Sequence, residues 1–192
     1  MNVDDGPADA PRPGFRGVWD RLVGPGATTT ETALVVGVAL TFPIGLLGYA
    51  HLAQLEWRPV QAAVVFVVAV DVAGGIVATT TRSGSRWWHR PDRTNRHHLT
   101  FVTAHVHPFV LAAVFAGFTW YDATIVYGFL LASAAVVVTV PLALTRPVAT
   151  IAFAAGLLVA LYWIDVPVGV EWFVPFLYLK LLLGHLVNGG QQ

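Results

Sequence analysis

The sequence predicts an all-α fold: a polytopic integral membrane helical bundle of six transmembrane helices, with the N- and C-termini in the cytoplasm. Of the 192 residues, 56% are hydrophobic and only 11% are charged, whereas a soluble domain carries about 25% charged residues. Apolar segments recur that are long enough to cross a hydrocarbon core, which takes roughly 20 residues. The formal net charge is zero, which does not suggest a nucleic-acid partner, and the absence of Cys excludes disulfides and thiolate metal sites.

The N-terminal segment, residues 1–28, is polar, acidic and rich in Gly and Pro. It lacks the basic region and the short apolar core of a signal peptide. We expect residues 1–14 to be disordered. Phe15, Val18, Trp19 and Leu22 recur at helical spacing, which predicts a short cytoplasmic helix at the membrane interface before the first span.

Breakers and charged residues divide the transmembrane domain, residues 29–188, into six predicted spans. Glu56 to Pro59 separate the first two, residues 83–95 separate the next pair, and Thr145-Arg146-Pro147 is expected to be a tight turn before the fifth. A tail, residues 189–192, follows the last span. The predicted spans are 29–54, 59–82, 96–119, 121–143, 147–164 and 170–188.

The distribution of arginine predicts the orientation. Cytoplasmic loops carry an excess of Lys and Arg, and one orientation leaves only Arg58 outside. The other nine arginines then lie inside: Arg12, Arg16, Arg21, Arg82, Arg86, Arg90, Arg93, Arg96 and Arg146. With the Ala/Val richness and a single Lys, this predicts a multi-pass protein of a prokaryotic cell (plasma) membrane.

Several ionisable residues fall at membrane depth, where such groups are costly and usually functional. Asp71 lies near the middle of the second span, eleven residues from Arg82. His107 lies eleven residues from Arg96 in the third span and therefore at the same depth. We therefore take Asp71 and His107 as candidate catalytic acid–base groups. Lys180, in the middle of the sixth span, is a competing partner that would neutralise Asp71.

Histidine is concentrated in one stretch, because five of the seven His lie between His89 and His107. On a straight helix His98 and His105 share a face about 10.5 Å apart, too far for both to reach one ion through bonds of about 2 Å. His107 would point the opposite way, which places polar groups on two opposite faces of the third span. Other helices should therefore surround this span, and we expect it to lie at the centre of the bundle. A metal site would draw single ligands from different spans, and the candidate ligands are His98, His105 and His185, for Zn or Fe.

The loop between the second and third spans carries Arg86, Arg90 and Arg93, with Arg82 and Arg96 on either side. These residues predict a basic rim at the inner leaflet. Its expected ligands are membrane lipids with anionic head groups, or the phosphate of a substrate or cofactor.

The His-rich stretch from His89 to His107 resembles, in its density of His, the boxes of membrane di-iron desaturases and hydroxylases. That family uses repeated His-x-x-His-His and His-x(3,4)-His boxes, and this chain contains neither. No family is therefore assigned from the residues.

Three functions remain open. The first is a His-coordinated metalloenzyme acting on a lipid or isoprenoid at the cytoplasmic leaflet. The second is a small proton-coupled transporter or channel using Asp71, His107, Lys180 and a stripe formed by Glu171, Tyr178 and His185. The third is a non-catalytic membrane subunit. The first is favoured because five His near one leaflet exceed what a simple proton relay needs.

Overall fold

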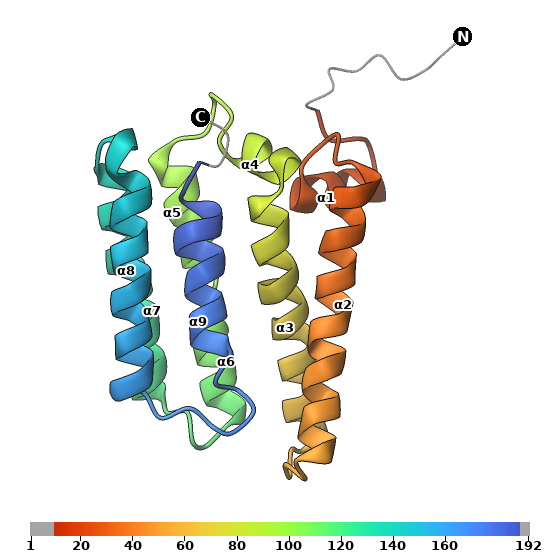
Figure 1. Cartoon of the computed structure of the whole chain (residues 1–192), viewed down its shortest axis with the longest axis vertical. Helices are drawn as coiled ribbons and strands as arrows, with labels where there is room; N and C mark the ends of the chain where they lie inside the picture. Colours follow the sequence, from red (N-terminus) through yellow and green to blue (C-terminus); the bar gives the residue numbers. More distant parts are fainter. Residues whose placement is uncertain (1–9, 189–192) are drawn as a thin grey trace.

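The computed structural model describes residues 10–188, and within that range the chain is helical with no strand (Figure 1). The last element, η1, is a π-helical turn that directly continues α9. The elements are α1 (Phe15–Val23), α2 (Thr29–Leu52), α3 (Pro59–Thr80), α4 (Arg82–Trp88), α5 (Asn95–Thr103), α6 (His107–Val114), α7 (Trp120–Thr139), α8 (Leu142–Tyr162), α9 (Phe173–Tyr178) and η1 (Leu179–His185).

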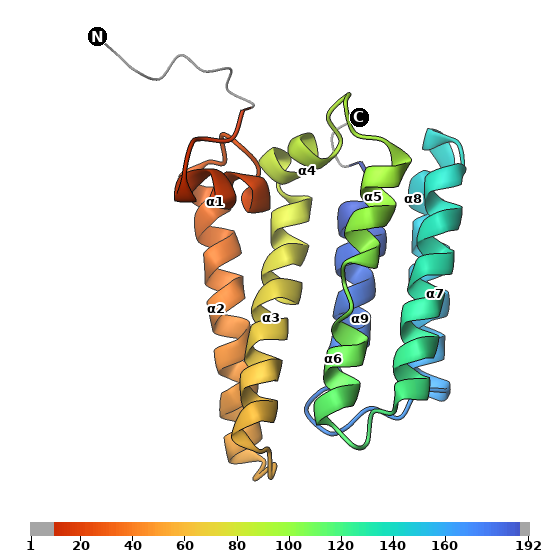
Figure 2. The same ribbon diagram turned by 180° about the vertical axis from the view of Figure 1, so that it is seen from behind.

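Four helices, α2, α3, α7 and α8, are long and apolar enough to cross a membrane. This indicates a membrane protein. The third and sixth predicted spans take a different form. The third is divided into α5 and α6, and the sixth is the shorter apolar run Phe173–His185. Both run alongside the long helices in the bundle (Figures 1 and 2).

The predicted turn at Thr145-Arg146-Pro147 is wrong. Helix α8 begins at Leu142, directly after Pro141, and Pro147 lies inside it. A proline lacks the backbone N–H and costs a helix least at its first turn. Pro141 therefore ends the preceding segment, whereas Pro147 removes only the bond to the Ala143 carbonyl, and the helix continues through it.

The predicted short helix before the first span is present as α1, while residues 1–9 of the expected disordered segment lie outside the described residues. Buried Asp20 anchors α1 by accepting hydrogen bonds from the backbone N and the Nε of Arg12, both at 2.9 Å. Hydrogen bonds from the Arg12 side chain hold the pKa of Asp20 below its usual value. Ser83 Oγ donates to the Val23 carbonyl at 2.9 Å, so α1 is fixed to the start of α4.

The C-terminal segment, not the third span, is the most buried part of the bundle. The side chains of Phe173, Leu177, Tyr178 and Leu181 are fully buried, and α9–η1 packs against α3 and α8, with α7 against η1. The expectation that the third span is central is therefore corrected. A helix surrounded on all sides positions its few polar residues, Lys180 and His185, in the interior.

Gly156 on α8 provides a test of this packing. A Cβ at Gly156 would lie 2.5 Å from ring carbons of Tyr178 and 2.9 Å from Phe129. We expect Gly156→Ala to lower the free energy of unfolding by about 1–3 kcal/mol, the usual cost of overpacking. A Cβ at Gly128 on α7 meets nothing within 4 Å, so Gly128→Ala should be neutral or slightly stabilising. Denaturant titrations of both variants in detergent micelles measure the difference, and equal effects would contradict this packing.

Candidate functional site

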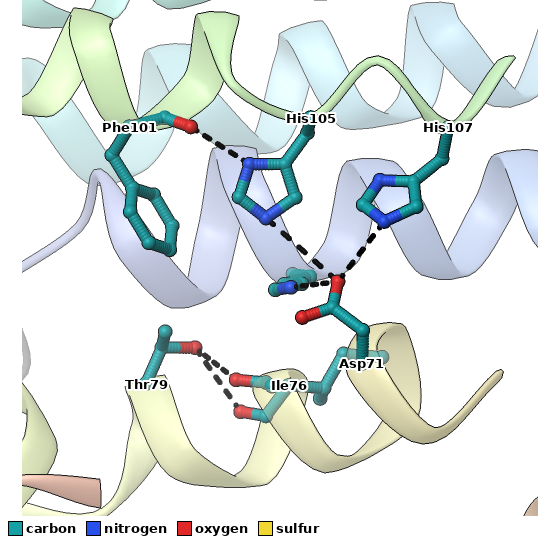
Figure 3. Close-up of polar contacts among 8 residues, drawn as sticks. Asp71, Ile76, Thr79, Phe101, His105 and His107 are labelled. Atoms are coloured by element: carbon teal, nitrogen blue, oxygen red, sulfur yellow. Dashed lines mark hydrogen bonds and ion pairs between the residues drawn. The ribbon is translucent and has the colours of Figure 1, made fainter. Parts of the chain in front are cut away.

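Three segments bring basic side chains onto one oxygen of Asp71 (Figure 3). Lys180 Nζ of η1 donates to Asp71 Oδ2 at 2.6 Å. His107 Nε2 lies 3.5 Å and His105 Nε2 4.0 Å from the same oxygen. His107 therefore lies beside Asp71, whose depth it was predicted to share, and so do His105 and the competing Lys180. We call these four residues the Asp71 cluster.

Both histidines reach Asp71 because the third span is interrupted. Helix α5 ends at Thr103 and α6 begins at His107, and residues 104–106 between them are not helical. The prediction that His105 and His107 point in opposite directions assumed a continuous helix and is wrong. Pro108, the second residue of α6, cannot donate a backbone hydrogen bond, which favours a break at this point.

The carbonyls released by the break have partners. The Phe101 carbonyl accepts from His105 Nδ1 at 2.7 Å, and the Thr103 carbonyl accepts from the Tyr127 hydroxyl at 2.7 Å. The Ala104 carbonyl accepts from Val106 N at 3.0 Å. Backbone carbonyls shielded from water require such partners, so the break is a built feature of the fold.

The hydrogen bond to Phe101 also fixes the tautomer of His105. A carbonyl only accepts, so Nδ1 of His105 carries the proton. In the neutral ring Nε2 then holds a lone pair that faces Asp71 and Lys180. His105 can take up a proton at Nε2 without losing its hydrogen bond to Phe101, which is what an acid–base group at this position needs.

Small residues on α3 make room for Lys180. A Cβ at Gly75 would lie 2.8 Å from Lys180 Nζ, and one at Gly74 would lie 2.8 Å from the Ala39 side chain. Lys180 lies in the π-helical turn η1. Such turns are rare in proteins, but those that occur are often found at functional sites.

The predicted stripe of Glu171, Tyr178 and His185 does not form on one helix face. Helix α9 begins only at Phe173, so Glu171 lies outside it, and the π-turn changes the rotation per residue.

An apolar groove of about 700 Å³ opens beside the cluster. Its walls come from α1, α2, α3, α4, α5, η1 and the residues after α5, and its polar wall residues are Asp71, Thr79, His105 and Lys180. The side chain of Asp71 is 46% exposed, whereas that of Lys180 is 3% exposed. Asp71 Oδ1 accepts no hydrogen bond from the part of the chain that the structure describes (Figure 3). The carboxylate therefore presents one free oxygen to the groove.

A second histidine cluster lies towards the end of the bundle that carries α4. His98 Nδ1 is 3.2 Å from His185 Nε2, and the rings of His89 and His98 are 5.0 Å apart. The Phe101 ring lies 4.1 Å from that of His185 and 4.7 Å from that of His105. Of the predicted metal ligands, His98 and His185 thus come together, while His105 belongs to the Asp71 cluster.

The structure does not support a metal site. Across residues 10–188 no group of three or more His, Asp or Glu is arranged to hold a metal ion. In the Asp71 cluster, the ammonium group of Lys180 lies against the carboxylate oxygen on which the histidines converge. That position is the one a bound cation would need, and a lysine there supplies the positive charge itself.

The arginines of the predicted basic rim have different environments. Arg90 stacks on Trp87 at 3.6 Å and pairs with Asp92 at 2.8 Å, and Arg86 Nη2 is 3.5 Å from the Pro25 carbonyl. Arg93 lies between Trp87 and Trp88, 5.7 Å and 5.6 Å from their ring centroids. Burial lowers the pKa of the neighbouring His89 and so favours its neutral form.

Comparison with protein-family models, with curated proteins and with solved structures gave no match. The function must therefore be argued from the geometry of the site.

Proposed function

We propose that this chain is an integral protein of a prokaryotic cell membrane that binds a lipid or isoprenoid in the groove and performs acid–base chemistry on its polar group. Asp71 and His107 are the proposed proton-exchanging residues. The observation that carries the proposal is a carboxylate, 46% exposed, in the wall of an apolar groove.

The proposal includes six spans with both termini in the cytoplasm. The interrupted segment α5–α6 covers residues 95–114, and 20 helical residues extend about 30 Å, the thickness of a bilayer core. Helix α1, the arginine-bearing α4 and the end of η1 lie at one end of the bundle (Figure 1). An excess of arginine at one end favours the cytoplasmic side, where the basic rim would contact anionic head groups.

The exposure of Asp71 favours a bound ligand. A charged side chain facing lipid at the centre of a span costs about 2.5–3.5 kcal/mol on insertion scales. Lys180 offsets the charge at Oδ2 but leaves Oδ1 open. An amphiphile whose apolar chain fills the groove and whose hydroxyl donates to Oδ1 would remove both the exposed carboxylate and the exposed apolar walls.

The cluster has the groups that proton transfer requires. A general base must lie within hydrogen-bond reach of the proton that it accepts, and Oδ1 faces the groove. Lys180 balances the negative charge of Asp71, and His107 Nε2, 3.5 Å from Oδ2, can exchange a proton with the carboxylate. We assign Asp71 as the base towards the ligand, His107 as its exchange partner, and Lys180 and His105 as positioning residues.

Farnesol, an isoprenoid alcohol, tests the proposal when compared with the same hydrocarbon lacking the hydroxyl. Binding to purified protein in nanodiscs is followed by native mass spectrometry. A hydrogen bond to a charged group contributes about 1.5–3 kcal/mol, so we expect farnesol to bind roughly 10- to 100-fold more tightly than the hydrocarbon. Asp71→Asn should reduce that preference, and Asp165→Asn, at an exposed carboxylate outside the groove, should not. Equal affinity of the unmodified protein for both probes would exclude the proposal.

Proton-coupled transport is the second candidate, and the interruption between α5 and α6 favours it. Transporters commonly hold substrates and coupling ions at broken helices near the membrane midplane. This function predicts proton flux into vesicles under an imposed pH gradient, measured with an enclosed pH-sensitive dye. Flux that is unchanged in Asp71→Asn would count against it.

A further inference from the structure

A polar pocket of about 480 Å³ lies at the α4 end of the bundle, apart from the groove. It is formed where α7 ends, α8 and α5 begin and η1 ends. Its polar lining residues are His89, Arg93, Asn95, His98, Thr139, Thr145 and Asn188, and the remaining lining is apolar. Arg93 is therefore the one permanently charged residue of its lining, and no carboxylate lines it.

Within residues 10–188, the guanidinium of Arg93 has no anionic partner. Its Nε is buried without a hydrogen-bond partner, and its side chain makes no ion pair within residues 10–188. The rings of Trp87 and Trp88 flank it. The nearby carboxylate, Asp92, pairs with Arg90 instead, at 2.8 Å. A buried donor on a charged group that lacks a partner is costly and calls for an explanation.

The other polar groups of the pocket lie near the ends of helices. Asn95 donates its amide to the Val138 carbonyl at 2.6 Å, which fixes the start of α5 against the end of α7. Thr145 carries a hydroxyl at the first turn of α8, where the partial positive charge of the helix terminus also favours an anion. His98 and His89 also line the pocket.

We infer that this pocket binds the phosphate group of a phosphate ester, with the Arg93 guanidinium as its main ligand. Arginine presents a planar set of donors that matches phosphate oxygens. Ligand pockets commonly measure about 300–1,000 Å³, and a volume of 480 Å³ accommodates more than a bare ion. The phosphate belongs either to a lipid head group or to a soluble phosphate ester. The pocket shares no lining residue with the groove, so the inference does not depend on the proposed acid–base chemistry, and it assigns a specific phosphate contact to Arg93 of the basic rim.

Two probes distinguish the sources of the phosphate. Glycerol 3-phosphate represents the soluble ester and is titrated into the full chain in micelles by calorimetry. Phosphatidylglycerol, compared with phosphatidylcholine, represents the lipid, and its retention after delipidation is measured by native mass spectrometry. Binding of the first alone identifies a soluble phosphate ester, and selective retention of phosphatidylglycerol identifies a head group. Either result supports a phosphate site.

Arg93→Gln should weaken whichever probe binds by about tenfold or more, because a charge-assisted hydrogen bond contributes about 1.5–3 kcal/mol. Arg21→Gln is the matched control: Arg21 is exposed, lies on α1 at the same end of the bundle and does not line the pocket. Its affinity should stay within about twofold of that of the unmodified protein. Melting temperatures without probe verify that both variants fold. Equal affinities of the unmodified protein and Arg93→Gln, equal losses in the two variants, or no binding of either probe would overturn the inference.

Discussion

Asp71→Asn should destabilise the protein more than Lys180→Met, and the double variant should recover most of the lost stability. Lys180 is 3% exposed, and its ammonium donates to Asp71 Oδ2 at 2.6 Å. Removing the carboxylate leaves a buried ammonium without its counter-charge, a change that typically costs about 3–5 kcal/mol. Because Asp71 is partly exposed to the groove, we expect the lower end of that range.

Lys180→Met should cost less, because Asp71 keeps other partners. His107 and His105 lie 3.5 Å and 4.0 Å from the same oxygen, and either imidazole can take up a proton to replace the lost charge. The methionine side chain also packs well in an apolar interior. In the double variant neither charge is present, and such neutral replacements of buried pairs are often tolerated.

The three variants form a double-mutant cycle, which measures the interaction directly. Unfolding in mixed micelles, titrated with a denaturing detergent, gives the free energies. The Arg90–Asp92 pair is the control, because Asp92 is mostly exposed and Asp92→Asn should cost less than about 1 kcal/mol. Additive effects of Asp71→Asn and Lys180→Met would show that the pair contributes no coupling.

The depths of the polar residues could be predicted from the sequence, but their directions could not. Counting residues from the inner arginines placed Asp71 and His107 at one level. That count depends only on the rise per residue, which a short interruption changes little. The direction in which a side chain points depends on the accumulated rotation of about 100° per residue along the helix. Three non-helical residues before His107 are enough to reverse the direction of its side chain.

The interruption itself left a signal in the sequence. Pro108 lacks a backbone N–H and therefore disfavours a continuous helix through the preceding turn. The carbonyls of Phe101 and Thr103, released by the break, accept from the His105 side chain and the Tyr127 hydroxyl. Tyr127 was not among the predicted site residues, because its partner lies on another span. Phe101, which separates the two histidine clusters, was also missed, since an aromatic residue in an apolar span is ordinary core.

The metal prediction failed to gain support for a related reason. The sequence shows how many histidines lie near one leaflet, but it does not show which of their side chains are in contact. In the structure Phe101 lies between His105 and His185, and Lys180 supplies the cation beside Asp71. The contact between His98 and His185 crosses 87 residues of sequence, so only the packing of η1 against α5 could reveal it.

A bulky side chain at Val67 should block the groove. Val67 lines the groove one helical turn before Asp71 and is 66% exposed. Side chains four residues apart on a helix are neighbours, so the indole of Val67→Trp would cover the free oxygen of Asp71 and fill part of the apolar volume. We expect the affinity for farnesol to fall by more than about tenfold, which is 1.4 kcal/mol of binding free energy.

Ile151→Trp is the matched control, because Ile151 is also a β-branched residue on a long apolar helix, is 69% exposed and does not line the groove. Both substitutions lie on the surface, so both should leave the free energy of unfolding within about 0.5 kcal/mol of the original value. Native mass spectrometry of the nanodiscs gives the affinities.

Three outcomes can be distinguished. If Val67→Trp bound farnesol as tightly as Ile151→Trp while Asp71→Asn still lost it, the ligand's polar end would lie at Asp71, but its hydrocarbon chain would not occupy the groove. A loss in Val67→Trp alone would instead place the chain in the groove without a hydrogen bond to the carboxylate. Only a loss in both variants agrees with an amphiphile that occupies the groove with its hydroxyl at Asp71.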